Sequence, residues 1–188
     1  MMKRIITLII IVYSSVSFSQ ETQAEQFWNT LQGLCGKSFE GTLELPENDE
    51  QFGGKKLVMH VRSCNERTIK IPFFVGEDKS RTWVLTLEED RITLKHDHRH
   101  KDGSEDEITL YGGKTTNSGQ STLQIFPADA DTMKMIPAAS SNVWWITLDD
   151  KKFTYNLRRL GTDRVFRVSF DLSKNIKNPT APWGWKEN

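Results

Sequence analysis

Hydrophobic and polar residues alternate over short stretches between residues 38 and 172, and clusters of Gly, Pro, Asp, Asn and Ser separate these stretches. Alternation places every second side chain on one face of a β-strand, so each stretch predicts a strand with one buried face. The predicted strands cover residues 38–45, 55–63, 67–73, 81–87, 92–100, 105–111, 121–126, 143–148, 152–157 and 164–172. Residues 133–136 fit either a strand or a helical turn.

One stretch with helical periodicity precedes these strands. Its apolar residues, spaced as on one face of a helix, are Ala24, Phe27, Trp28, Leu31 and Leu34. Thr22 and Glu25 match a capping box, in which each side chain accepts a hydrogen bond from the other residue's backbone N–H. We therefore expect a short amphipathic helix after Thr22, whose Phe27 and Trp28 cover one end of the core.

About ten short strands joined by short turns predict an antiparallel meander, because no internal helix is long enough to connect parallel strands. An open sheet of this size has two exposed edges, and closure into a barrel removes them. We therefore predict an all-β fold in which the meander closes into a barrel with a short N-terminal helix. A β-sandwich is the alternative.

The start of the first predicted strand resembles that of lipocalin-like (calycin) barrels. The stretch Leu34-Cys-Gly36-Lys-Ser-Phe39-Glu-Gly41 follows the helix directly and is similar to the Gly-x-Trp or Trp-x-Gly motif of those families. Phe39 stands where the families usually have Trp. The resemblance implies a cup that holds an apolar ligand, or haem as in some bacterial relatives.

The first nineteen residues have the order of regions typical of a secretory signal peptide. Lys3 and Arg4 are basic, residues 5–13 are almost wholly apolar, and residues 14–19 are mostly small, so we expect cleavage before Gln20. The apolar run is shorter than the roughly 20 residues that span a bilayer. We therefore expect an exported protein, periplasmic or extracellular, whose mature chain has no membrane span. A retained N-terminal anchor is the alternative.

Composition favours a globular domain without affinity for polyanions. The sequence has 25 basic and 25 acidic side chains, and cleavage would remove two basic ones and leave a formal charge of −2. This balance excludes the basic surface by which proteins bind nucleic acid. Six Trp and ten Phe favour a folded core. We expect a single barrel domain over residues 20–177 and an irregular, Trp-containing tail over residues 178–188; no pattern indicates an oligomeric state.

Cys35 and Cys64 are the two cysteines of the sequence. In an oxidising compartment such a pair predicts a disulfide. If residues 39–45 and 55–63 form a hairpin, opposed residues have numbers that sum to about 99–101, and the two cysteines would meet at its open end. Two separate buried thiols are the alternative.

Three of the four histidines lie at alternate positions: His96, His98 and His100. On a β-strand this spacing directs all three imidazoles to one face. The pair Asp102-Gly103 follows and favours a tight hairpin turn. The opposed pairs expected from this turn are His98 with Glu107, His100 with Glu105, and Arg99 with Asp106.

Two interpretations of this hairpin remain open. Cross-strand ion pairs stabilise a solvent-facing hairpin by about 0.2–1 kcal/mol each, which requires no chemistry. Alternatively, His96, His98 and Glu107 supply nitrogen and oxygen ligands for zinc or another divalent transition metal. His100 with Glu105 is the competing ligand set. An open coordination position would then allow a metal-dependent enzyme.

A second group of candidate residues lies in the first hairpin. His60 and Arg62 alternate with apolar residues, and the register that joins the cysteines places His60 opposite Phe39. If this face lines the barrel, His60 and Arg62 would orient the anionic end of a small-molecule ligand, with Phe39 beside them. A buried His60 bonded to the backbone is the alternative.

Three functions follow from these patterns. The first is a small-ligand-binding barrel of unknown ligand, and the second is a metal-binding protein or metal-dependent enzyme. The third is an interaction protein of the cell envelope whose Trp-rich tail contacts a partner.

Overall fold

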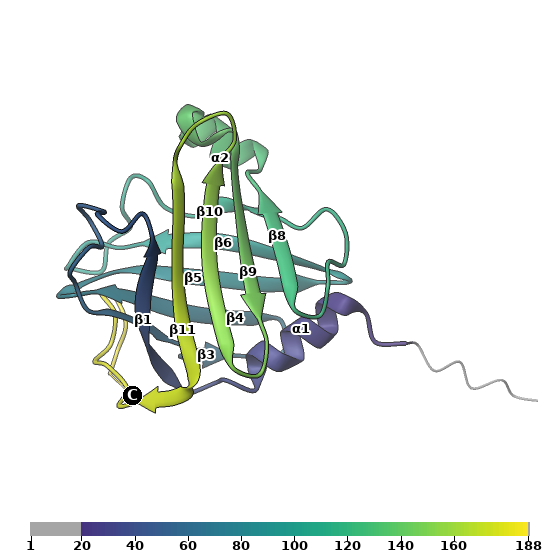
Figure 1. Ribbon diagram of the computed structural model, residues 1–188, viewed down its shortest axis with the longest axis horizontal. Coiled ribbons are helices and arrows are strands. Elements are labelled where there is room, and N and C mark those ends of the chain that lie inside the picture. Colours follow the sequence, from purple (N-terminus) through teal and green to yellow (C-terminus); the bar gives the residue numbers. More distant parts are fainter. Residues whose placement is uncertain (1–19, 188) are drawn as a thin grey trace, which may run out of the picture.

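The computed structural model describes residues 20–187, so the predicted signal peptide, residues 1–19, lies outside the described residues. One antiparallel sheet, with strand order β7-β6-β5-β4-β2-β1-β11-β10-β9-β8 and β3 paired to β4, curls into a nearly closed barrel (Figure 1). The strands are β1 (Ser38–Leu45), β2 (Leu57–His60), β3 (Ser63–Cys64), β4 (Thr68–Val75), β5 (Asp78–Glu88), β6 (Arg91–His98), β7 (Tyr111–Lys114), β8 (Leu123–Pro127), β9 (Asn142–Leu148), β10 (Lys152–Arg159) and β11 (Val165–Ile176). The helices are α1 (Gln23–Gln32), α2 (Ala130–Met135) and the 3-10 helix η1 (Pro137–Ala139). The predicted all-β barrel is confirmed.

Helix α1 has the predicted capping box. The Thr22 side chain accepts from the Glu25 backbone N–H, and the Glu25 carboxylate accepts from the Thr22 backbone N–H. Phe27 and Trp28 are almost fully buried in the core cluster. The helix therefore covers one end of the barrel, and α2 lies at the other end of the front strands (Figure 1).

The barrel closes where β7 approaches the end of β8. The Asp129 backbone N–H donates to the Gly112 carbonyl at 3.0 Å, and Gly113 forms an isolated bridge with Ala128. A Cβ on Gly113 would lie 1.8 Å from the Pro127 carbonyl oxygen, so only glycine allows this approach. The Thr132 hydroxyl, on α2, donates to the Gly112 carbonyl at 2.8 Å. This seam joins the two ends of the sheet through a few polar contacts instead of a full strand pairing.

The strand predicted over residues 105–111 is wrong. Residues 106–110 form no strand, and β7 begins only at Tyr111, which pairs with His96. Arg99 therefore bridges Glu105 and not Asp106. The alternation in this segment does not reflect burial: Ile108 and Leu110 are 48% and 44% exposed, and Leu110 has a positive φ of 58° that interrupts the strand.

The first hairpin also differs from its predicted register by one residue. Phe39 pairs with Met59, and Ser38 pairs with His60. A shift of one residue moves every side chain to the opposite face. His60 therefore belongs to the outer face of β2, while Phe39 and Met59 point into the core.

The predicted disulfide is confirmed between Cys35 and Cys64, whose Cα atoms are 6.2 Å apart. Residues 133–136, for which the sequence left a strand or a helical turn open, belong mainly to α2. Asp129 caps this helix by accepting from the Thr132 backbone N–H. No helix in residues 20–187 has the length and apolarity needed to cross a membrane.

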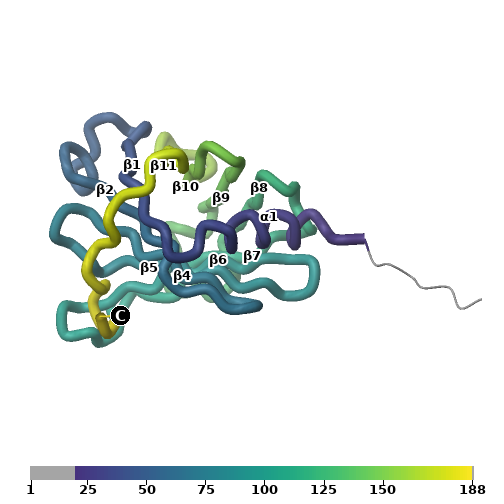
Figure 2. Tube along the Cα trace, turned by 90° about the horizontal axis from the view of Figure 1, so that it is seen from below, coloured from purple at the N-terminus to yellow at the C-terminus, as the bar shows by residue number. Residues whose placement is uncertain are grey.

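The C-terminal segment runs from β11 along the outside of the barrel (Figure 2). Trp183 donates its backbone N–H to the Lys79 carbonyl on β5, and the Lys186 carbonyl accepts from Arg62 at 2.8 Å. Lys70 and Arg62 lie over the Trp185 ring at 5.3 and 5.9 Å. The tail thus covers the outer face of β2, β4 and β5.

Candidate functional site

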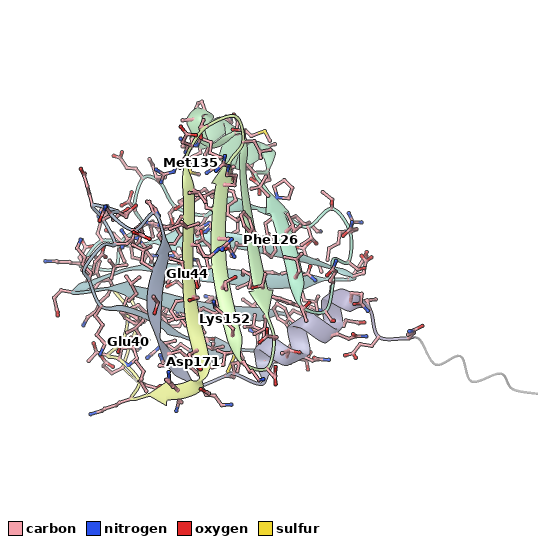
Figure 3. The ribbon with its side chains drawn as sticks, viewed as in Figure 1. Glu40, Glu44, Phe126, Met135, Lys152 and Asp171 are labelled. Atoms are coloured by element: carbon pink, nitrogen blue, oxygen red, sulfur yellow. A yellow bond between two sulfur atoms is a disulfide. The ribbon has the colours of Figure 1, made fainter. Side chains whose placement is uncertain are left out.

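The barrel contains a cavity of about 680 Å³ at the end opposite to α1. It opens between the loop around Gln51, the turn around Arg164 and the 3-10 helix η1, all of which contribute lining residues. Helix α2 marks this end in Figure 1, and Met135 marks it in Figure 3. A concave, largely pre-formed cavity with a few polar groups is the usual form of a small-molecule site.

Seven aromatic side chains contribute to the cavity wall. The aromatic lining residues are Phe52, Phe73, Trp83, Tyr111, Trp144, Tyr155 and Phe166. The Trp83 ring stacks between Phe73 at 4.8 Å and Tyr155 at 4.4 Å, with interplanar angles of 16°. Because Phe73 and Trp83 come from one wall and Tyr155 from the other, this stack bridges the barrel interior. The other half of the barrel, towards α1, is filled by core side chains.

His96 is buried in the wall with both ring nitrogens bonded. Its Nδ1 lies 3.0 Å from the Tyr111 carbonyl oxygen, and its Nε2 lies 2.7 Å from the Tyr155 hydroxyl. A carbonyl can only accept, so Nδ1 carries the proton and the Tyr155 hydroxyl donates to Nε2. Burial lowers the pKa of His96 to about 3 and raises that of Tyr155 well above 10. Both groups are therefore neutral at neutral pH.

His98 lies next to His96 on the same inner face of β6. Its Nε2 is 3.2 Å from the Tyr111 hydroxyl, and it pairs across the sheet with Arg81. Burial, with the nearby Arg81 charge, lowers the pKa of His98. Burial raises the pKa of Tyr111 to about 12. The cavity wall thus holds two neutral imidazoles and two neutral phenols.

Some charged residues of the cavity lining lie on strands, and others lie in loops or turns. Arg81 stands on β5 within the barrel, whereas the acidic lining residues lie in loops or turns: Asp49, Asp106 and Asp163. The Asp49 carboxylate accepts from the backbone N–H groups of Gln51 and Phe52. Arg159 on β10 and Arg164 in a turn also line the cavity, so the strand-borne wall carries positive charge and the loops carry both signs.

The structure brings together two of the three residues predicted to bind a metal. His96 and His98 both line the cavity, but Glu107 lies in the exposed segment after the turn and does not line it. The turn at Asp102-Gly103 is present, and His100 is exposed beside it. Within residues 20–187, no cluster of three or more His, Cys, Asp or Glu side chains has a geometry that could hold a metal ion.

The residues predicted to bind a ligand do not line the cavity. His60 is buried on the outer face of β2, and Arg62 contacts the tail there. Burial, with the charge of Arg62, lowers the pKa of His60 to about 4, and Nδ1 of His60 has no hydrogen-bond partner among the described residues. Phe39 is fully buried in the packed core.

Sequence reasoning missed the residues that form the cavity, above all Arg81, Trp83 and Tyr155. A signal exists, because these side chains alternate with polar ones in strands that were predicted correctly. Alternation identifies the inner face of each strand. It does not show which inner residues fill the barrel and which surround an open space.

The charged side chains on the outer face of β1, β10 and β11 differ from the buried polar groups of the cavity wall. Figure 3 shows Glu44 and Lys152 side by side there, and their ion pair measures 2.8 Å. Both are partly exposed, so the pair resembles ordinary surface charges and contributes about 0–1 kcal/mol.

Comparisons of the chain with protein-family models, with curated proteins and with solved structures found no match. The nearly closed antiparallel barrel is consistent with the calycin-like fold that the first strand resembles.

Proposed function

We propose that the protein binds a small, largely apolar molecule in the cavity at the end of the barrel opposite to α1. The observation that carries the proposal is the cavity of about 680 Å³ that is lined by seven aromatic side chains. Burying an apolar ligand there would contribute about 25 cal/mol per Å² of surface removed from water. Nδ1 of His98, which has no hydrogen-bond partner among the described residues, would orient the ligand through a hydrogen bond.

Export to the periplasm or the extracellular space belongs to the same proposal. It is supported by the signal-peptide pattern of residues 1–19 and by the bond between Cys35 and Cys64, which is typical of oxidising compartments. The protein would then bind its ligand outside the cytoplasm. Cell fractionation with a C-terminal epitope tag tests this, and a cytoplasmic, uncleaved chain would refute it.

Native mass spectrometry of protein purified from its own host tests ligand binding. We expect one copurified small molecule per chain. Filling the cavity by Ala139→Trp, at the buried lining position of η1, should abolish its retention, whereas Ala138→Trp at the exposed neighbour should not. A ligand-free wild type that also binds no member of a library of apolar small molecules would refute the proposal.

A further inference from the structure

We infer that the ligand of this cavity is an anion, a flat conjugated molecule that carries a carboxylate, sulfonate or similar group directed at Arg81. This inference rests on the proposed function. It concerns the chemical class of the ligand, and it is supported by the position and the hydrogen bonds of Arg81.

Arg81 presents an incompletely satisfied positive charge to the cavity. Its side chain is only 14% exposed, and its guanidinium lies over the Phe52 ring at 5.6 Å. A guanidinium has five N–H donors. Within residues 20–187, the Arg81 side chain has one hydrogen-bond partner, the Asp78 carboxylate, and Asp78 does not line the cavity. The remaining donors suit an acceptor that enters from the opening.

A further hydrogen-bond donor lies beside Arg81. His98 pairs with Arg81 across the strands, and its Nδ1 has no hydrogen-bond partner among the described residues. An imidazole in the tautomer with a proton on Nδ1 would donate to the same anionic group. A cationic ligand would instead meet the Arg81 charge. Bidentate contacts between arginine and carboxylate or sulfonate are among the stronger polar interactions.

Aromatic rings beside Arg81 favour an apolar ring system in the ligand. Trp83, next but one to Arg81 on the same face of β5, is stacked between Phe73 and Tyr155, which cover both faces of its ring. The stack therefore bounds the cavity as a rigid apolar wall against which an aromatic ring system would be buried. A conjugated ring system held against this wall would place its anionic substituent near Arg81.

Two fluorescent probes with nearly the same rings separate charge from shape. One is 8-anilinonaphthalene-1-sulfonate, and the other is N-phenyl-1-naphthylamine, which lacks the sulfonate. We expect the wild type to bind one sulfonate probe per chain at least tenfold more tightly than the neutral probe. Arg81→Met should weaken binding of the sulfonate probe about tenfold and leave the neutral probe within twofold.

A second variant should change the affinity for the sulfonate probe in the opposite direction. Asp78→Asn keeps an acceptor for the Ser80 backbone N–H but removes the charge that competes for Arg81, so sulfonate binding should strengthen several-fold. If Arg81 and Asp78 act only on the fold, both variants should weaken binding of both probes. Arg158→Met, an exposed arginine on β10 outside the lining, is the matched control and should change neither affinity.

The outcomes separate the two proposals. Equal affinity for both probes, or an Arg81→Met variant that affects them equally, would overturn the anionic ligand and leave the binding cavity standing. If neither probe binds, and the host protein carries no copurified molecule, the proposed function fails as well. Thermal unfolding of each variant checks that it is folded at the temperature at which probe binding is measured.

Discussion

At the scale of single residues, the unusual feature is a buried polar pair inside an aromatic wall. His96 and Tyr155 satisfy each other at 2.7 Å, and the Tyr111 carbonyl satisfies the remaining ring nitrogen. A buried polar group that loses its partner costs far more than a satisfied pair contributes. The network therefore holds the cavity wall in one arrangement.

Tyr155→Phe should destabilise the protein by about 1–3 kcal/mol, because Nε2 of His96 would lose its donor in a buried site. Urea unfolding monitored by tryptophan fluorescence measures this change. Tyr111→Phe is the comparison, and we expect a smaller loss because its partner His98 is only partly buried and water can replace the hydroxyl. Equal losses in the two variants would contradict this view of the network.

His60 should make stability depend on pH. Its pKa is about 4 in the folded protein and about 6.5 in the unfolded chain, so the unfolded chain binds the proton first. The stabilisation that comes from neutral His60 is complete above pH 6.5 and is lost as pH falls towards 4. The loss should be on the order of 1–3 kcal/mol.

The His60→Gln variant tests this by urea unfolding at pH 7 and pH 5. The loss of stability between these two values should be smaller in the variant than in the wild type. A wild type and a His60→Gln variant with the same dependence would contradict the prediction.

At the scale of elements, the region before and within the first hairpin is held by a covalent link. The disulfide joins Cys35, after α1, to Cys64 in β3, with 29 residues of sequence separation. The Gly36 backbone N–H also donates to the Val61 carbonyl at 2.7 Å. The link therefore anchors the segment between helix and barrel to the edge of the first hairpin.

Replacing both cysteines by Ala should cost about 3–4 kcal/mol, the loop-closure entropy expected for a ring of this length. Guanidinium unfolding of the double variant measures this loss. Reduced wild type is the control and should have the same free energy of unfolding as the variant. A wild type that is equally stable with and without a reducing agent would show that the bond contributes nothing.

At the scale of the whole molecule, the seam between β7 and β8 decides whether the sheet is a barrel. It depends on a close backbone approach at Gly113 and on hydrogen bonds from the Thr132 hydroxyl and the Asp129 backbone N–H to the Gly112 carbonyl. Asp129 also forms an ion pair of 2.6 Å with Lys95 on β6. Polar contacts of α2 and of its N-cap residue therefore complete the closure of the barrel.

Gly113→Val should open this seam, since its Cβ would overlap the Pro127 carbonyl. We expect faster hydrogen exchange at the backbone amides of β7 and β8 and a loss of stability of several kcal/mol, as for other severe steric conflicts. Lys114→Val, at the next and partly exposed position, should preserve the slow exchange. Unchanged exchange in Gly113→Val would show that the seam is not needed for closure.

Much of the fold was predictable from local patterns. The capping box of α1, nine of the ten predicted strand positions and the bond between Cys35 and Cys64 agree with the structure because each depends on neighbours in sequence or on a short hairpin. The failure at residues 105–111 has a local cause too. Leu110 adopts a left-handed conformation, which alternation of residue types cannot reveal.

The candidate site was only half predictable. His96 and His98 share the inner face of one strand, as their spacing implies. Glu107 depended on pairing across a turn, where the insertion of a few unpaired residues moves a carboxylate away from the face. His60 changed sides for the same reason, through a register shift of one residue.

Local patterns were sufficient for the N-terminal helix, most of the strands, the class of the fold and the covalent link, because periodicity and short-range pairing decide them. Which inner side chains fill the barrel and which line a cavity is a result of packing between distant strands. That outcome depends on how Trp83 from one wall meets Tyr155 from the other. Such packing joins residues 72 positions apart in the chain, and no local pattern records the space that they leave open.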